Sequence, residues 1–237
     1  MQLPFFLRLP RSIEYGAKLV INNLIAALIF LTIGIGSPGQ ANAEQITIAA
    51  LGDSLVHGYG LQQQLGFVPQ LEQWLLAQGF DVKLINAGVS GDTTAGGLAR
   101  VDWTLSPDVD ALIVSLGGND VLRGIDPEVS RTNLQGILSK ATAKNVPVLL
   151  VGISAPGNFG ADYQEQFNAI YPDLAKQYGV LLYPNFLRAL ADLPDRAGAL
   201  AQYFQPDAIH PNADGVELIV ENIGPSVAAL VAVATAD

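Results

Sequence analysis

The sequence predicts an α/β domain of three layers, α/β/α, in which a five-stranded parallel sheet lies between two layers of helices. Two observations carry this prediction. Short, almost continuous apolar runs indicate buried strands, and longer segments with a helical spacing of apolar residues separate them. Strands that are apolar along their whole length are typical of parallel sheets covered by helices on both faces.

In chain order, the first strand is the best supported, because residues 46–51 are β-branched or apolar up to Gly52. The four later strands repeat this apolar pattern at residues 82–87, 111–116, 146–153 and 180–183. The helical patterns between and after them cover residues 67–78, 94–103, 127–144, 163–178 and 213–231. Neither an internal repeat nor a linker divides this part of the chain, so one domain is expected.

Composition excludes several classes of protein. Half of the 237 residues are hydrophobic and 14% are charged, which is typical of a folded globular chain. A formal net charge of −10 disfavours nucleic acid or an anionic membrane as the main partner, since both are negative. The chain has no cysteine, which excludes a thiolate nucleophile and a cysteine-based zinc site.

The first 43 residues differ from the rest and are predicted to be a signal peptide, with the domain at residues 44–237. Basic residues precede an apolar run at residues 24–35, and Ala41-Asn42-Ala43 matches the small-x-small pattern read by signal peptidase. The alternative is an uncleaved anchor, because the apolar stretch can be extended back to Leu19. Either form implies export, to the periplasm or beyond.

Polar and glycine-rich segments follow the first three predicted strands, namely residues 52–55 (GDSL), 86–93 (NAGVSGDT) and 117–120 (GGND). A fourth segment, residues 207–211 (DAIHP), lies just before the last helix. Ligands of parallel α/β sheets bind beyond the carboxyl ends of the strands, so these segments are expected to meet at one rim of the sheet.

A serine nucleophile needs a base within hydrogen-bond reach and a group that orients the base. The chain has only two histidines, His57 and His210. His57 follows Ser54 by three residues and has no carboxylate at an obvious spacing, whereas His210 follows Asp207 by three. We therefore expect His210 to be the base and Asp207 to orient it, with His57 a polar residue beside the site.

An acyl transfer also needs hydrogen-bond donors for the negative charge that develops on the carbonyl oxygen. The candidates are the backbone amides of Ser54 and Gly91 and the side-chain amide of Asn119. Each motif alone has a simpler explanation, since Gly-Asp-Ser is a common turn or helix N-cap and Gly-Gly-Asn-Asp a common turn. The combination of all the required roles at strand ends is what indicates a catalytic site.

These residues resemble the GDSL/SGNH hydrolases, and the resemblance covers about residues 46–231, essentially the whole chain after the predicted signal peptide. Ser54 in GDSL, Gly91 in NAGVSGDTT, Asn119 in GGND and His210 in DAIHP correspond in order to the four residues that give the second name. Asp207 matches the acid of the family's triad. One departure is Ala208, where glycine is frequent in the family.

The segments GDTTAGGLAR and GGNDVLRG are similar to those of a bacterial subgroup of multifunctional thioesterases, lysophospholipases and arylesterases. The resemblance implies a flavodoxin-like sheet and an acyl pocket bordered by residues 121–126. It also implies substrate contacts from residues beside the nucleophile and beside Asn119, namely Asp53, Leu55, Asp120, Val121, Leu122 and Arg123. The nucleophile elbow of α/β-hydrolases is excluded, because residues 52–56 lack its second glycine.

The expected function is hydrolysis of a small-molecule ester, thioester or lysophospholipid through an acyl-enzyme, with neither metal nor organic cofactor. Two alternatives remain open at this point. One is a carbohydrate acetyl esterase on the same fold, and the other is a binding module without catalytic activity. The sequence leaves the preferred acyl chain, the leaving group and the oligomeric state undetermined.

Overall fold

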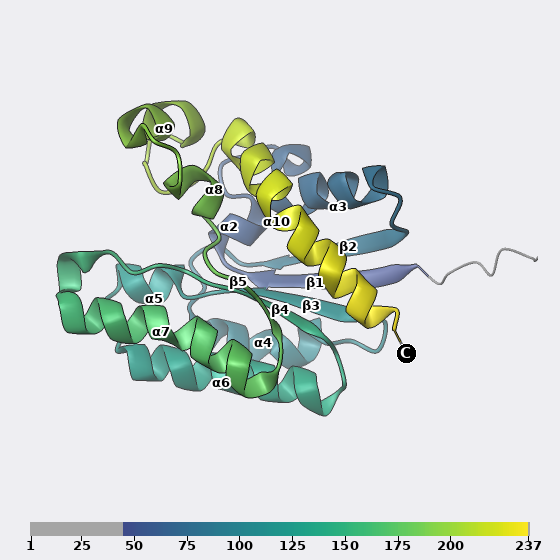
Figure 1. Ribbon diagram of the computed structural model, residues 1–237. Coiled ribbons are helices and arrows are strands. Elements are labelled where there is room, and N and C mark those ends of the chain that lie inside the picture. Colours follow the sequence, from purple (N-terminus) through teal and green to yellow (C-terminus); the bar gives the residue numbers. More distant parts are fainter. Residues whose placement is uncertain (1–44, 237) are drawn as a thin grey trace, which may run out of the picture. The chain divides into compact units, whose positions relative to one another are not determined.

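Five strands form one parallel sheet in the order β2-β1-β3-β4-β5 (Figure 1). The structure is a computed structural model, and it describes residues 45–236. The strands are β1 (Ile46–Gly52), β2 (Val82–Gly88), β3 (Ala111–Ser115), β4 (Val148–Val151) and β5 (Leu181–Tyr183). The chain runs from β1 outward to β2 and then crosses to β3 on the other side of β1, which is the flavodoxin-like order. The predicted fold class is therefore confirmed.

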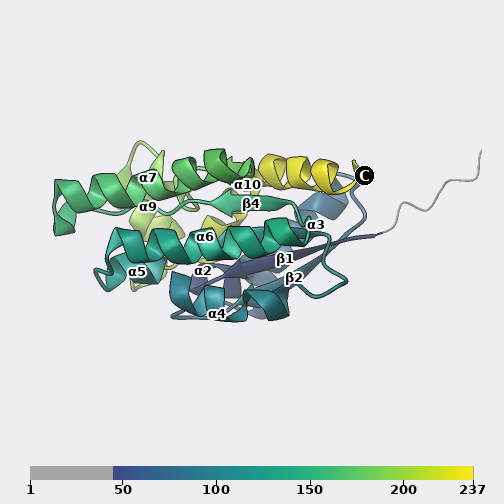
Figure 2. The same ribbon diagram turned by 90° about the horizontal axis from the view of Figure 1, so that it is seen from below.

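Helices cover both faces of the sheet. One layer contains α3 (Phe67–Ala77) and α10 (Ala213–Ala234), and the other contains α4 (Thr94–Thr104), α6 (Pro127–Ala143) and α7 (Ala161–Tyr178). Figure 2 shows the second layer from below. Successive residues of β1 point to opposite layers: Ile48 and Ala50 belong to the core beneath α3 and α10, and Ala49 and Leu51 to the core beneath α4, α6 and α7.

The last helix, α10, is long and apolar enough by composition to cross a bilayer. In the structure it instead packs one side against the sheet and α3, and Ile219, Ile223, Val227 and Leu230 are fully buried there. Core helices pass the same composition test, so its hydropathy is accounted for by this packing.

The structure adds short helices that the sequence analysis did not expect. These are α2 (Ser54–His57), α5 (Gly118–Leu122), α8 (Arg188–Ala191) and α9 (Arg196–Tyr203). Segments of four to eight residues complete too few turns to show an apolar period, which explains why the sequence did not reveal them. The fourth strand is also shorter than predicted, and the predicted signal peptide lies outside the described residues.

Two of these short helices lie at the carboxyl ends of strands, where the motifs were expected. Helix α2 follows β1 directly and rests against the end of β2. A side chain at Gly88 would not fit, because its Cβ would lie 2.3 Å from the backbone nitrogen of His57. Glycine at position 88 therefore allows the helix that begins at Ser54 to approach the sheet closely.

Candidate active site

Ser54 is the first residue of α2, at the carboxyl end of β1. Asp53 caps this helix, since its Oδ1 accepts a hydrogen bond of 3.0 Å from the backbone N–H of Leu55. The side chain of Ser54 reaches across to the loop before α10, where its Oγ lies 2.8 Å from Nε2 of His210. The two residues are 156 positions apart in the sequence, and the sheet brings them into hydrogen-bond contact.

The ring of His210 is held from its other nitrogen by Asp207. Nδ1 of His210 lies 2.7 Å from Oδ2 of Asp207, while Oδ1 of Asp207 accepts from the backbone N–H groups of Ile209 at 2.9 Å and His210 at 3.0 Å. These hydrogen bonds lower the pKa of Asp207 from 3.8 to about 2, and the two from His210 have the largest effect. The carboxylate is therefore charged at neutral pH and fixes the imidazole with Nε2 directed to the serine.

The tight turn between these two residues places Ala208 in the left-handed region, with φ of +56°. This explains why glycine would fit at a position where the sequence has alanine. Gln205 holds the same loop from outside: its side-chain amide donates to the carbonyls of Tyr59 at 2.8 Å and Pro211 at 2.9 Å. The ring of Tyr59 also lies 4.7 Å from the ring of His210, measured between centroids.

Asp53 is a buried carboxyl at the floor of the site, with 2% of its surface exposed. Burial raises the pKa of Asp53 from 3.8 to about 6, against the opposing effects of the Leu55 N–H, the His210 charge and the side chain of Asn119. The nearby charge of Asp120 raises the pKa further. Asp53 thus caps α2 and is hydrogen-bonded to the side chain of Asn119.

The two other predicted donors lie near Ser54 on neighbouring strand ends. Gly91 is in the turn after β2, which a bond of 3.0 Å from the N–H of Asp92 to the carbonyl of Val89 closes. Its φ is +83°, a conformation that glycine adopts readily and other residues avoid. Asn119 is in the first turn of α5, at the end of β3. Ser54, Gly91 and Asn119 line one groove.

This groove has a volume of about 580 Å³ and a largely apolar lining. Its lining residues come from α2, α5, α8, α9, the turn after β2, the segments after β4 and β5 and the loop before α10. The residues that line it are Asp53, Ser54, Leu55, Tyr59, Ser90, Gly91, Gly118, Asn119, Val121, Leu122, Ile153, Ser154, Ala155, Pro156, Asn185, Leu187, Ala191, Arg196, Ile209 and His210. A second cleft of about 680 Å³ lies at the amino-terminal ends of β3, β4 and β5 and contains none of the motif residues.

The structure divides the residues that were expected to contact substrate. Asp53, Leu55, Val121 and Leu122 line the groove, and Leu122 is 61% exposed there. Asp120 and Arg123 are not among the lining residues.

Asp120 is fully buried and directed away from the groove, so the expectation that it contacts substrate does not agree with its position. Its Oδ2 accepts from the N–H of Thr94 at 2.9 Å, and its Oδ1 accepts from the hydroxyls of Thr94 and of Ser130, the latter at 3.0 Å. A buried carboxylate needs such partners, and here they fix the start of α4 to α5 and α6.

Arg123 is also outside the groove lining. Its Nη2 instead donates to the carbonyl of Gly91, at 2.8 Å. His57 lies on the same short helix as Ser54, but the partner of its Nδ1 is the carbonyl of Gly88, at 3.2 Å.

Several groove residues were missed by the sequence analysis. Leu187, Ala191 and Arg196 come from α8 and α9, where no motif or period marked them. Ser154, in the segment after the fourth strand, also lines the groove. The rule that sites lie at the carboxyl ends of strands was the one signal that could have indicated the segment after β4.

Comparisons with known proteins agree on one family. The model of the GDSL-like lipase/acylhydrolase family matches residues 50–218. The esterase TesA of Pseudomonas aeruginosa is 38% identical over 201 residues, which are 84% of this chain and 92% of that protein. A thioesterase 1/protease 1/lysophospholipase L1 of Escherichia coli is 37% identical over 74% of this chain and 80% of its own length. The crystal structure of AlinE4, an SGNH-hydrolase family esterase, is 46% identical, with a TM-score of 0.64 over 78% of this chain and 96% of that one.

Proposed function

Because the chain belongs to the GDSL-like lipase/acylhydrolase family and is an ester hydrolase, we propose that Ser54, His210 and Asp207 form its catalytic triad. The supporting observation is the unbroken series of contacts from Ser54 Oγ to His210 Nε2 at 2.8 Å and from His210 Nδ1 to Asp207 Oδ2 at 2.7 Å. A base that is itself oriented by a carboxylate is what a serine nucleophile requires.

The reaction proceeds in two steps. Nε2 of His210 takes the proton of Ser54 as its oxygen bonds to the carbonyl carbon, and the imidazolium then gives that proton to the departing alcohol or thiol as the acyl bond to it breaks. Water attacks the acyl-enzyme in the second step, with His210 taking its proton and returning it to Ser54 Oγ. The amides of Ser54 and Gly91 and the side chain of Asn119 donate to the oxyanion in both steps.

The direct test is Ser54→Ala with p-nitrophenyl acetate and with a fluorophosphonate label. Loss of the nucleophile is expected to lower kcat by at least about 10³-fold and to abolish labelling. His57→Gln is the matched control, because it removes the other imidazole near the serine while leaving the triad contacts intact, and it should keep both activities. Wild-type rates in Ser54→Ala would refute the triad, and absence of labelling in the wild type would favour a binding module.

The groove favours an acyl chain over a carbohydrate as the group next to the scissile bond. Apolar side chains such as Val121, Leu122, Ile153 and Leu187 form much of its lining. An aliphatic chain buried there gains about 0.8 kcal/mol per methylene. Among p-nitrophenyl esters from acetate to laurate, kcat/KM should therefore rise with chain length until the groove is filled. Activity confined to acetyl esters, together with release of acetate from acetylated xylan, would favour the alternative of a carbohydrate acetyl esterase.

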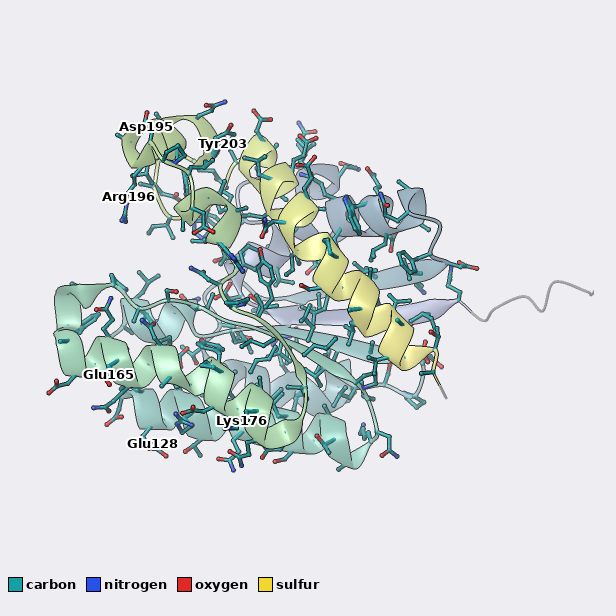
Figure 3. The ribbon with its side chains drawn as sticks, in the orientation of Figure 1. Glu128, Glu165, Lys176, Asp195, Arg196 and Tyr203 are labelled. Atoms are coloured by element: carbon teal, nitrogen blue, oxygen red, sulfur yellow. The ribbon has the colours of Figure 1, made fainter. Side chains whose placement is uncertain are left out.

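One cation favours a lysophospholipid within this substrate class. Arg196 lines the groove at the start of α9, and Figure 3 shows it on the side of that helix facing α7. It has no ion-pair partner among residues 45–236. A phosphate diester on the leaving group would supply the missing negative charge.

The corresponding test compares lysophosphatidylglycerol with a neutral monoacylglycerol that carries the same chain. Arg196→Gln should reduce the preference for the phospholipid, whereas Arg131→Gln, at a surface ion pair with Asp173, should not. An unchanged preference in Arg196→Gln would leave the neutral ester or the thioester as the substrate.

Residues 1–43 are proposed to direct export and to be removed after Ala43, which would place the hydrolase in the periplasm or outside the cell. Amino-terminal sequencing of the exported protein should begin at Glu44. A mature chain that retains residues 24–35 would support the uncleaved anchor instead.

A further inference from the structure

We propose that Arg100 is a positioning residue of the reaction, which holds the Gly91 turn at a fixed place relative to Ser54. The proposal rests on the proposed role of the Gly91 N–H as an oxyanion donor. Arg100 lies on α4 and is not among the residues that line the groove. Its effect would therefore act through the two backbone carbonyls and the Asp92 carboxylate that it binds.

The guanidinium of Arg100 makes three hydrogen bonds to three different parts of the site. Nη2 donates to the carbonyl of Gly52 at 2.8 Å, Nη1 to the carbonyl of Ala87 at 2.6 Å, and Nε to Oδ2 of Asp92 at 2.6 Å. Gly52 ends β1 two residues before the nucleophile, Ala87 lies near the end of β2, and Asp92 follows Gly91. One side chain thus joins the nucleophile's strand to the turn that carries the oxyanion donor.

The Gly91 turn needs support of this kind. Ser90 and Gly91 are both exposed, and one backbone hydrogen bond, from Asp92 to Val89, closes the turn. Glycine has wide conformational freedom, so a rotation of the peptide before Gly91 would redirect its N–H at little cost. Holding Ala87, four residues before Gly91, and Asp92, directly after it, reduces that freedom before substrate binds. Preorganised donors are what make an oxyanion hole effective.

Arg123 holds the same turn from its solvent side, with Nη2 donating to the carbonyl of Gly91 at 2.8 Å. The segment from Gly91 to Asp92 therefore lies between two guanidinium groups, one from α4 and one from the residue that follows α5. Helix α4 is in turn tied to α5 through Thr94 and Asp120, the residue next to Asn119. The positions of both proposed donors, Gly91 and Asn119, thus depend on α4.

Three acceptors in fixed directions match the planar fork of arginine and not the single ammonium of lysine. A charge effect and a geometric effect are therefore separable. Arg100→Lys keeps the charge beside Asp92, but it cannot reach all three acceptors with the same geometry. Both Arg100→Lys and Arg100→Gln should lose the positioning.

The experiment compares a p-nitrophenyl ester with the matching thionoester, in which sulfur replaces the carbonyl oxygen. Sulfur is a weak hydrogen-bond acceptor, so the thionoester gains little from the oxyanion donors. A misplaced donor costs about 10²-fold in rate. We expect both Arg100 variants to lower kcat on the oxygen ester by about this factor with little change in KM, and to lower the ratio of oxygen-ester to thionoester rates by a similar factor.

Arg131→Gln is the matched control and should leave both rates and their ratio unchanged. Circular dichroism and the thermal midpoint report whether the Arg100 variants fold. If the Arg100 variants do not fold, Arg123→Gln is the second variant, because its side chain is exposed. It should lower the ratio of oxygen-ester to thionoester rates to a smaller extent.

An Arg100 variant that is folded and slows both esters equally would overturn the proposal, and so would wild-type activity in Arg100→Lys. An unchanged rate ratio in Arg123→Gln would also count against it if the Arg100 variants do not fold. Failure of the triad itself is recognised separately, from activity that persists in Ser54→Ala.

Discussion

Replacing Asp53 by asparagine should stabilise the protein at pH 8 and lower its stability at pH 4 by about 1 kcal/mol. Asp53 is 2% exposed, and burial raises its pKa from 3.8 to about 6. The folded state therefore prefers the neutral carboxyl. As the pH rises from about 4 to about 6, the unfolded chain loses its Asp53 proton first and the free energy of unfolding falls.

The magnitude follows from the shift in pKa. A shift of about 2 units corresponds to about 3 kcal/mol of stability that is present below pH 4 and absent above pH 6. Asparagine does not titrate, and its Oδ1 can still accept from the N–H of Leu55, so the helix cap is kept. Its amide must reorient beside Asn119, which offsets about 1 kcal/mol of the gain. We expect Asp53→Asn to be about 2 kcal/mol more stable than the wild type at pH 8, a rise of about 4–8 °C in Tm.

The assay is urea denaturation and thermal unfolding of both proteins at pH 4 and pH 8. Asp108→Asn, at an exposed carboxylate, is the control and should behave alike at both values. A loss of stability in Asp53→Asn that is equal at the two pH values would refute the reasoning. So would a gain that is larger at pH 4, because burial would then not be the cause of the shift.

Three further predictions follow from single residues. Ala208→Gly should raise the free energy of unfolding by up to about 1 kcal/mol without loss of activity, because alanine is strained at φ of +56°; urea denaturation measures it, and a destabilised variant would contradict it. Asp120→Ala should lower the free energy of unfolding by about 3 kcal/mol, because the two donors of Thr94 and the Ser130 hydroxyl lose their acceptor. A loss under about 1 kcal/mol in the same assay would show that water replaces the carboxylate. Asp207→Asn should lower kcat by about 10³–10⁴-fold at unchanged KM. The pKa of Asp207 is lowered to about 2, so its contribution to the free energy of unfolding is lost only as the pH falls from about 4 toward 2. Any loss of kcat between about pH 5 and 8 in the wild type should therefore not arise from this carboxyl.

The sequence by itself determined the layers of the fold and the residues proposed for the triad. Continuous apolar runs such as residues 46–51 require burial on two faces, and that requirement is local to each run. Few residues could be the base, because the chain has only two histidines. Asp207 could be paired with His210 because it lies three positions before it. Segments at strand ends were predicted to converge because parallel strands share one carboxyl edge.

Only the tertiary structure decided the groove and the surroundings of each carboxyl. Asp53 and Asp120 both lie beside motif residues in the sequence, yet one lines the groove and the other is enclosed by Thr94 and Ser130. In the sequence, nothing distinguishes Arg100 from a solvated helix residue. Only the structure shows its acceptors, the carbonyls of Gly52 and Ala87. Such contacts join residues that are 10 to 48 positions apart in the sequence. Apolar periodicity reports only which side of a segment is buried, so the partners of a buried polar group are decided when the layers pack together.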